Sequence, residues 1–358
     1  MRSIVEGNLG FHSESVADTF LFIIRRVEIM MMVNGFTARE AQVGIKQIKD
    51  FFERRLAENL NLTRVSAPLF VKPETGLNDN LSGTEKPVVF EMRKYGQALE
   101  IVQSLAKWKR MALKWYEFEV DEGIYTDMNA IRPDEYVDNI HSIYVDQWDW
   151  ERVIRNDDRH LEFLKEIVES IFDTFKATER FINDLYPLRL YKKLPDEIFF
   201  ISAQELEDRW PNETSKNREH LIAKEHRAVF IYQIGHKLRS GIPHDLRSPD
   251  YDDWNLNGDI IFWNPALEES IELSSMGIRV DENSLIKQLE LTNTTDKLEM
   301  DYHKKLINKE LPYTIGGGIG QSRICMFFLQ AKHIGQVQAS VWSEDEIKKC
   351  EEKGIFLL

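Results

Sequence analysis

The sequence predicts one large domain with an α/β or α+β core, and three observations support this prediction. Stretches with apolar residues at near-helical spacing, such as 38–59, predict long amphipathic helices. Between them lie short runs of β-branched and aromatic residues that are typical of strands. A glycine stretch at 316–320 leads into an apolar helix. Because no repeat, low-complexity linker or dividing charge run interrupts the chain, we expect a single domain at 32–358 after a helical extension at 1–31.

Composition places the chain among globular proteins and bounds its partners. With 42% hydrophobic and 30% charged residues, the 358-residue chain can bury a large core. A formal net charge of −14 argues against nucleic acid as a partner, because phosphate binding needs clustered lysines and arginines. Two cysteines, Cys325 and Cys350, exclude a disulfide framework and predict a reducing, cytoplasmic setting. The apolar run at 19–24 is too short to span a bilayer, so no membrane association is expected.

The first part of the chain predicts two helices followed by a strand. The first helix is expected at 16–32, and a capping-box pattern at Thr37–Glu40 opens the second at 38–59. The apolar stripe of the second helix suits either a dimer interface or core packing. A strand is expected at 60–70 and must lie at an edge or bulge around Pro68, which has no N–H to donate.

The next segment predicts a loop, a hairpin and a helix. The loop at 76–83 is rich in turn residues and contains Asp79, although most such loops are plain connections. A β-hairpin is expected at 88–102. Ser104 is a candidate cap for the following helix, and Lys107 lies one turn into it, either solvated or directed at an anion.

Residues 130–153 predict a strand, a loop and a returning antiparallel strand. Pro133 forces the chain out of regular structure, so Arg132, Asp134 and Glu135 fall in the loop. The returning strand mixes acids and an amide with tryptophans. A guanidinium held over a sheet face dense in carboxylates suits an enzyme that binds a polyanion and an amino acid together. The alternative is an ordinary hairpin with a solvated face.

The second half predicts one more long helix and several short strands. The helix is expected at 157–186, where Pro187 stops it. Short apolar runs of strand length follow at 199–202, 228–234, 259–263 and 273–280.

The glycine stretch at 316–320 is interpreted as a loop that enters a helix. It lacks the spacing of a Rossmann fingerprint, and no Gly-Lys-Ser/Thr follows it as in a Walker loop. Arg323 falls on the first turn of the helix, where it can lie over a purine ring or reach a terminal phosphate. A tight strand-to-helix joint with an exposed arginine is the alternative.

Several charged residues are candidate ligands. Asp259 and Glu272 are expected to begin or end strands, and their carboxylates are hard oxygen donors that suit Mg²⁺ beside phosphates. The acids at 251–253 and Arg279 complement the two charges of an amino acid. For His141, a structural role is predicted slightly more strongly than a catalytic one. Taken singly, each carboxylate is more often a surface group.

These features resemble a known family. A helix and strand ending at Pro68, the loop of Arg132 and the glycine stretch before Arg323 stand in the order of the three motifs of class II aminoacyl-tRNA synthetases. More closely, the chain resembles ammonia-dependent asparagine synthetase (aspartate–ammonia ligase) from about residue 32 to about residue 342. The stretches that carry the resemblance are DNLSGTEKPV, SLAKWKR, RPDE, HSIYVDQWDWERV, SPDYDDW, NGDI, WNP, ELSSMGIRV, TIGGGIGQSR and HIGQVQASVW.

The resemblance implies an α+β fold, namely a class II synthetase-like catalytic domain with an antiparallel-rich mixed sheet flanked by helices, in a homodimer. It implies an enzyme that joins aspartate to ammonia with ATP and Mg²⁺. The side-chain carboxylate of aspartate would attack the α-phosphorus, which gives a β-aspartyl-adenylate and releases pyrophosphate. Ammonia would then displace AMP.

The resemblance also implies residue roles. The catalytic residues would be Arg132, Asp79 and Gln147, with Arg132 bridging the reacting carboxylate and α-phosphate and Asp79 taking the proton that ammonium must lose. Residues implied to bind the amino acid are Lys107, Asp149, Asp252, Ser274 and Arg279. Residues implied to bind ATP are Arg132, Glu135, His141, Glu272, Ser275 and Arg323. The implied metal ligands are Asp259 and Glu272.

Three other functions compete with this one. An aspartate- or lysine-type aminoacyl-tRNA synthetase would need an anticodon-binding domain, for which the N-terminal extension is too short. A non-catalytic paralogue has no physical reason to keep Arg132, Glu272 and Arg323 together. A glutamine-dependent asparagine synthetase needs an N-terminal nucleophilic cysteine, whereas both cysteines lie near the C-terminus.

Overall fold

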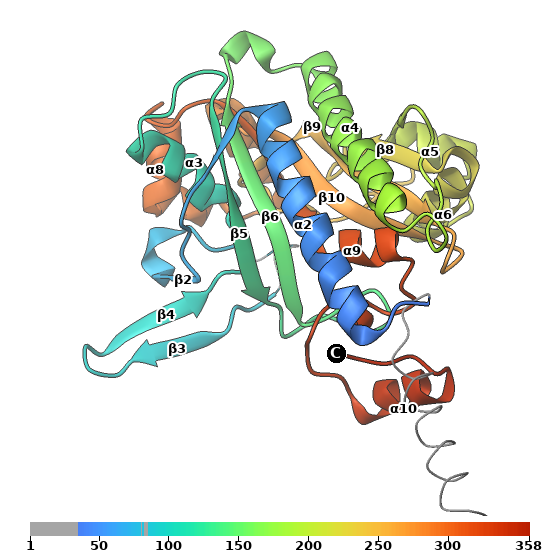
Figure 1. Ribbon diagram of the computed structural model, residues 1–358. Coiled ribbons are helices and arrows are strands. Elements are labelled where there is room, and N and C mark those ends of the chain that lie inside the picture. Colours follow the sequence, from blue (N-terminus) through green and yellow to red (C-terminus); the bar gives the residue numbers. More distant parts are fainter. Residues whose placement is uncertain (1–34, 80, 82–84) are drawn as a thin grey trace, which may run out of the picture.

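A large twisted sheet with helices on both faces organises the computed structural model, which describes residues 35–79, 81 and 85–358 (Figure 1). The predicted extension at 1–31 and its helix at 16–32 lie outside the described residues. The sheet has eight strands in the order β1-β5-β6-β11-β10-β9-β8-β7. Their bounds are β1 Leu62–Arg64, β5 Gly123–Ile131, β6 Tyr144–Val153, β7 Phe199–Ser202, β8 Ala228–Tyr232, β9 Asp252–Asn264, β10 Glu269–Arg279 and β11 Thr314–Gly320. All neighbours are antiparallel except β1 with β5 and β7 with β8, so the expected antiparallel-rich mixed sheet is confirmed.

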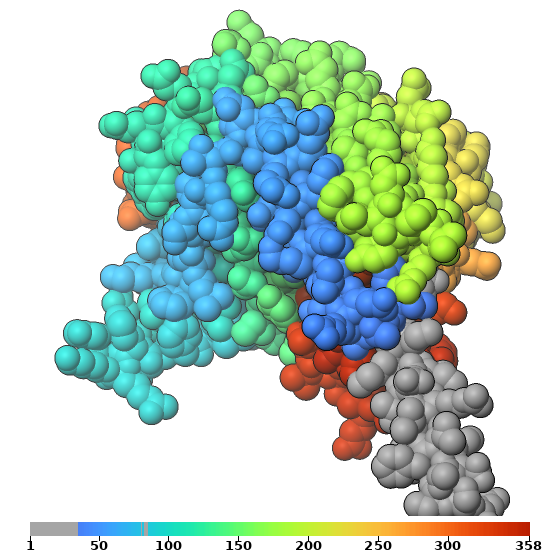
Figure 2. Space-filling view, in the orientation of Figure 1, coloured from blue at the N-terminus to red at the C-terminus, as the bar shows by residue number. Residues whose placement is uncertain are grey.

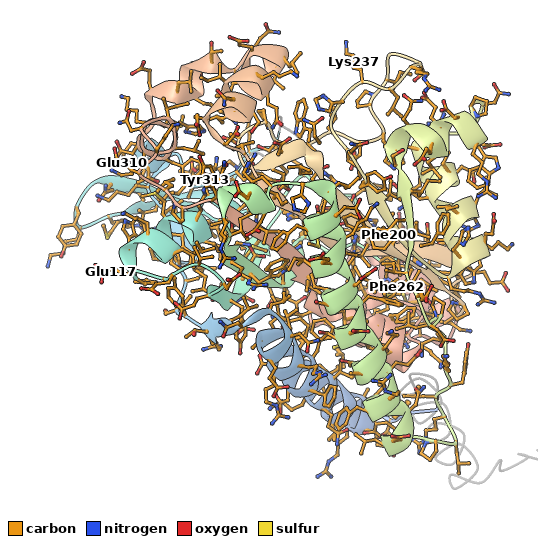
Figure 3. The ribbon with its side chains drawn as sticks, turned by 90° about the horizontal axis from the view of Figure 1, so that it is seen from above. Glu117, Phe200, Lys237, Phe262, Glu310 and Tyr313 are labelled. Atoms are coloured by element: carbon orange, nitrogen blue, oxygen red, sulfur yellow. The ribbon has the colours of Figure 1, made fainter. Side chains whose placement is uncertain are left out.

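Two long helices cover one face of the sheet and lie side by side (Figures 1 and 2). These are α2 (Ala38–Leu60) and α4 (Leu161–Leu185), and α9 (Gln321–Leu329) packs beside them. The ring of Phe52 on α2 stacks on Trp148 of β6 with 4.9 Å between centroids. Further along the same face of the sheet, the ring of Phe262 on β9 packs against that of Phe175 on α4, with 4.9 Å between centroids. Figure 3 shows Phe262 beside that helix.

The opposite face of the sheet carries a second core. There α3 (Ala106–Trp115), α7 (Glu282–Thr292) and α8 (Asp301–Ile307) pack on β5, β6 and the end of β10. A third cluster lies at the β7–β9 end with α5 (Ala203–Arg209) and α6 (Ser215–His226). The remaining elements are α10 Glu344–Glu352 and the 3₁₀ turns Pro73–Thr75, Asn156–Asp158, Thr295–Glu299 and Ile334–Gln336. No helix within the described part of the chain is long and apolar enough to cross a membrane.

The start of α2 confirms the predicted capping box. The Thr37 hydroxyl accepts the Glu40 N–H at 3.2 Å, and the Glu40 carboxylate accepts the Thr37 N–H at 2.9 Å. The apolar stripe of α2 is buried inside this chain, with Ile48, Phe52 and Leu56 at 0% exposure. The stripe therefore serves core packing, which was one of the two expected uses.

Three local predictions are wrong in detail. The strand expected at 60–70 is split into β1 and β2 (Phe70–Val71), which belong to different sheets because the chain turns away between them. Helix α4 begins at Leu161 instead of 157, since residues 156–158 form a 3₁₀ turn and His160 caps the helix. Ser104 is not the cap of α3: Leu105 occupies that position, and the Ser104 hydroxyl accepts the Ala106 N–H at 3.2 Å.

The hairpin predicted at 88–102 is confirmed as β3 (Val89–Met92) and β4 (Gln97–Ile101), which form a small sheet with β2. This sheet projects from the body of the molecule (Figures 1 and 2). The predicted hairpin at 130–153 is confirmed as β5 and β6.

The glycine stretch is a central strand and not a loop, so that prediction is wrong. Strand β11 pairs with β6 on one side and β10 on the other. Glycines are needed there because side chains of the neighbouring strands cross over it. A Cβ on Gly318 would lie 2.5 Å from the Gln147 Oε1, and one on Gly317 would lie 2.6 Å from the Met276 Cβ.

Candidate active site

Two adjoining cavities open on the sheet face opposite α2, over the middle strands. Their volumes are about 220 Å³ and about 270 Å³. Four residues line both cavities, namely Arg132, Gln147, Glu272 and Gly318. A ligand in one cavity therefore meets a ligand in the other beside Arg132, which follows β5 directly.

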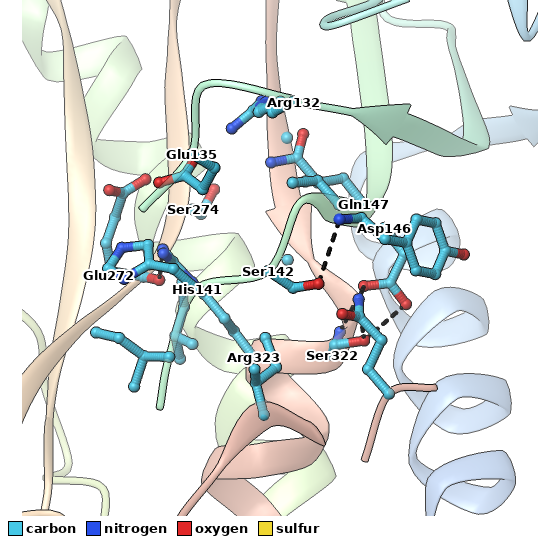
Figure 4. A pocket seen from close by; sticks show the side chains of 18 residues that line it. Arg132, Glu135, His141, Ser142, Asp146, Gln147, Glu272, Ser274, Ser322 and Arg323 are labelled. Carbon is cyan, nitrogen blue, oxygen red and sulfur yellow. Dashed lines mark hydrogen bonds between the residues drawn. The ribbon is translucent and has the colours of Figure 1, made fainter. Parts of the chain in front are cut away.

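The first cavity brings together most of the residues expected to bind ATP (Figure 4). They are Arg132, Glu135, His141, Glu272 and Arg323. Arg323 is fixed because its Nη1 donates to the backbone oxygen of Glu272 at 2.9 Å. Arg132 has one anchor, an Nη2 bond to the backbone oxygen of Gln103 at 3.2 Å, and its buried Nε–H has no partner among the described residues. Its guanidinium is thus positioned but still able to donate to a ligand.

Glu272 and Asp259 lie within strands β10 and β9, so the prediction that they begin or end strands is wrong. A β-bulge falls between Glu272 and Ser274, and such bulges re-aim side chains beside active sites. Burial raises the pKa of Glu272, but the guanidiniums of Arg323 and Arg247 outweigh burial and hold that pKa below its usual range. Its carboxylate is therefore ionised where it faces both cavities.

Asp259 lies outside both cavities, in contact with the Arg247 that lines the second one. The side chain of Asp259 pairs with Arg247, and burial raises its pKa even though Arg247 opposes the shift. Its Oδ1 is buried and has no hydrogen-bond partner among the described residues. Asp259 faces Ser275 in the β9–β10 register, and Ser275 lines the second cavity.

A network of buried charges lines the second cavity and extends behind it. Lys109 on α3 donates to the Asp149 Oδ2 at 2.9 Å and to the Gly317 backbone oxygen at 3.0 Å. Arg279 pairs with Glu151 at 2.7 Å and with Asp252. The network therefore holds three carboxylates against two cations, and the Asp149 Oδ1 is buried without a partner among the described residues. This surplus of negative charge suits an ammonium group.

Three residues expected at the site lie elsewhere. Lys107 and Asp79 line neither cavity, and Ser274 lines the first cavity instead of the amino-acid side. Lys107 is buried and donates to the Asp250 Oδ2 at 3.1 Å. Asp79 is fully buried, and its two carboxylate oxygens have no hydrogen-bond partner among the described residues. Burial raises the pKa of Asp79, although the charge of Lys107 opposes the shift.

Sequence reasoning missed several residues that shape the cavities. Lys109 and Arg247 line the second cavity, and no motif distinguished them from neighbouring basic residues. Asp146 lies on the opposite face of β6 from Gln147 but lines the first cavity near the start of that strand. It binds the Ser322 hydroxyl at 2.8 Å, and Lys49 of α2 at 2.9 Å. Figure 4 shows the bonds between Asp146 and Ser322.

Comparison with solved structures gives the class of fold. An asparaginyl-tRNA synthetase of Pyrococcus horikoshii, solved with asparaginyl-adenylate, superposes with a TM-score of 0.61 at 14% identity over 84% of this chain and 68% of that one. An asparaginyl-tRNA synthetase of Entamoeba histolytica superposes with a TM-score of 0.58 at 12% identity over 88% and 70%. The fold is therefore that of the class II aminoacyl-tRNA synthetases, as the sequence predicts.

Comparison of sequences gives the family. The family model for aspartate–ammonia ligase matches residues 39–354. The chain is 61% identical over 321 residues to an aspartate–ammonia ligase of Clostridium tetani, with 89% of this chain and 94% of that protein covered. It is 59% identical over 329 residues to the one of Fusobacterium nucleatum, with 92% and 100% covered. The chain belongs to the aspartate–ammonia ligase family of enzymes.

Proposed function

We propose that the protein makes asparagine from aspartate and ammonia, using ATP, through a β-aspartyl-adenylate and with release of AMP and pyrophosphate. The observation that carries the proposal is the pair of cavities that meet at Arg132, Gln147 and Glu272. A nucleotide in the first cavity and an amino acid in the second would bring the α-phosphorus and a carboxylate to one point. Holding two reactants in this way supplies much of the rate enhancement of a condensation.

In this proposal Arg132 stabilises the charge that develops on the α-phosphate as the β-carboxylate attacks. Its Nη2 is anchored to the Gln103 backbone oxygen, and its Nε–H has no partner in the described part of the chain, so the guanidinium can donate to both reacting groups. Glu135, His141 and Arg323 would hold the rest of ATP, with Arg323 over the adenine ring or at the γ-phosphate.

The amino acid would lie against the charged network of the second cavity. The unpartnered Asp149 Oδ1 accepts from the α-ammonium, and Arg279 donates to the α-carboxylate. Gln147 faces the β-carboxyl end. Lys107, which is buried against Asp250, and Ser274, which lines the first cavity, would act on the amino acid through their neighbours.

Asp79 is the proposed acceptor of the proton that ammonium loses. Its carboxylate is unpartnered among the described residues, and burial raises its pKa, which makes it a stronger base than an exposed aspartate. Leu81 and Glu85, which follow it in the chain, line the second cavity. Because Asp79 lines neither cavity, its side chain would have to move to reach the substrate.

Mg²⁺ is the cation that would accompany ATP, and the residues present fit it. Glu272 is an ionised carboxylate facing both cavities, and Asp259 has an unsatisfied buried oxygen close by. The cation would offset phosphate charge when bound. Glu272 and Asp259, with the hydroxyl of Ser275, would hold it.

Homodimer formation and a cytoplasmic location complete the proposal. Dimerisation is expected from the family resemblance alone, because the apolar stripe of α2 is used in the core. Both Cys325 and Cys350 are free and buried, in keeping with a reducing compartment.

The test is product analysis of the purified protein with ATP, Mg²⁺, aspartate and either ammonium or glutamine. We expect asparagine and AMP in equal amounts with ammonium. AMP without asparagine, aspartate attached to tRNA, or no turnover would each contradict the proposal. ADP in place of AMP would refute the adenylate.

A further inference from the structure

Glu151 of β6 is a buried carboxylate that the reaction proposed above does not use. Its side chain is 0% exposed and borders neither cavity. It contacts Arg279, which does line the second cavity. The Arg279 Nε donates to the two Glu151 oxygens at 2.9 and 3.1 Å, and its Nη2 donates to Oε2 at 2.7 Å.

This contact fixes the orientation of the guanidinium. Arginine has five N–H donors in one plane. Glu151 takes the Nε–H and one Nη2 hydrogen, and Asp252 takes one Nη1 hydrogen. Among the described residues no further acceptor contacts Nη1 or Nη2, so each Nη keeps one hydrogen that can be donated to a ligand such as a carboxylate.

Groups from β11 and α3 surround the Glu151 carboxylate. Thr314 of β11 donates its hydroxyl to the Glu151 Oε1 at 2.7 Å, and Lys109 lies 3.9 Å from Oε2. Gly316 lies over the carboxylate, where a Cβ would collide with Oε2. Burial raises the pKa of Glu151, but Arg279 and Lys109 outweigh it and hold that pKa below its usual range.

We propose that Glu151 is a positioning residue that holds Arg279 so that its two remaining N–H groups face the α-carboxylate of the amino-acid substrate. The proposal rests on the proposed function, since it assigns the second cavity to the amino acid. It predicts that loss of the carboxylate weakens binding of the amino acid and leaves the nucleotide cavity unaffected.

The variant Glu151→Gln tests this proposal because it keeps size and removes one acceptor. The amide places N–H groups against the guanidinium, so Arg279 must turn. We expect the KM for aspartate to rise about 10- to 100-fold, by analogy with the loss of a residue that orients a metal ligand. The KM for ATP should stay within about twofold of the wild type, because Glu151 does not border the first cavity.

A milder variant and a matched control separate positioning from general destabilisation. Thr314→Val removes one hydrogen bond to Glu151 and should raise the KM for aspartate less, in the same direction. Glu179→Gln is the control, because Glu179 is also a buried carboxylate and accepts the Lys193 N–H at 2.6 Å far from the cavities. It should lower the melting temperature without a selective change in the KM for aspartate.

The outcomes are distinct. An unchanged KM for aspartate in Glu151→Gln, or equal rises for aspartate and ATP, overturns the positioning role. If that variant does not fold, an unchanged KM in Thr314→Val overturns it. Wild-type protein that makes no asparagine refutes the proposed function instead.

Discussion

At the scale of single residues, Arg132 lies where the two cavities join. Its position in the loop after β5 lets its side chain reach a ligand in either cavity. Pro133 ends the strand directly after it, so the side chain leaves the sheet and has one backbone anchor. We expect Arg132→Ala to slow AMP formation about 10²–10³-fold, the usual cost of losing one donor to a transition state. Rapid-quench measurement of AMP formation checks this.

The fold should tolerate that change, because Arg132 is half-buried and forms no ion pair among the described residues. Arg155→Ala is a suitable control, since Arg155 is an exposed arginine paired with Asp121 away from the cavities. Both variants should melt close to the wild type. A fall in the melting temperature of Arg132→Ala large enough to explain the lost rate would contradict its role.

Lys107 and Lys109 show a limit of prediction from the sequence, because the sequence does not indicate which of them lines a cavity. Both lie in one short basic stretch, and only Lys109 lines a cavity. A helix usually reveals its inner face by the spacing of apolar residues. Helix α3 is buried on all sides from Ala106 to Leu113, so the spacing of its apolar residues does not distinguish an inner face from an outer one. Which lysine reaches the cavity depends on β11 and on Asp250, which are distant in sequence.

At the scale of elements, β11 is the strand whose glycines make room for the site. Propensity predicts a loop for four glycines, and the strand exists because Glu151, Gln147 and Met276 pass over it from both neighbours. The sequence of the segment contains no signal that identifies these neighbouring strands. The antiparallel pair β5–β6, by contrast, agrees with the prediction, because Pro133 marks locally where β5 ends and the β-branched and aromatic residues after the loop mark β6.

We expect Gly318→Ala to damage catalysis more than folding. The new Cβ would lie 2.5 Å from the Gln147 Oε1 and 3.0 Å from the Asp149 Oδ1, so both groups must move. A shift of about 1 Å at an active site can cost about 10²-fold in rate. Steady-state kinetics with varied aspartate measures the loss.

Gly317→Ala provides the comparison, because it adds the same methyl group towards Met276 on the other face of β11. Each variant should lose about 1–3 kcal/mol of unfolding free energy through overpacking. The KM for aspartate should rise more in Gly318→Ala. Equal rises would show that the strand as a whole, and not its cavity face, sets the effect.

At the scale of the whole molecule, the order of strands could not be derived from local pattern. Strands β11 and β6 pair although they are far apart in the sequence. Strands β10 and β9 begin well before the runs predicted at 273–280 and 259–263. Some of the extra residues are polar and buried, as Asp252 and Ser270 are, and such residues carry no apolar signal that marks a strand. The family resemblance supplied the fold class that periodicity left open.

Stability should depend on pH through Lys193, which packs where the segment after α4 meets α9. Its ammonium lies 5.3 Å from the Phe327 ring and 3.9 Å from Glu179, and burial lowers the pKa of Lys193 to about 8. The unfolded chain, with a pKa near 10.5, then binds more protons between about pH 8 and about pH 10.5. The contribution of Lys193 to the unfolding free energy of the wild type therefore rises with pH across that window.

We expect Lys193→Met to be more stable than the wild type at pH 7, by at most about 3 kcal/mol, because no ammonium must be desolvated. The advantage should shrink as the pH rises from about 8 to about 10.5, where the wild-type lysine becomes neutral in the unfolded chain too. Denaturant unfolding at several pH values measures it. Lys192→Met, at an exposed neighbour paired with Asp196, should change stability little at any pH. A difference between Lys193→Met and wild type that does not vary with pH would show that packing, and not the buried charge, controls stability here.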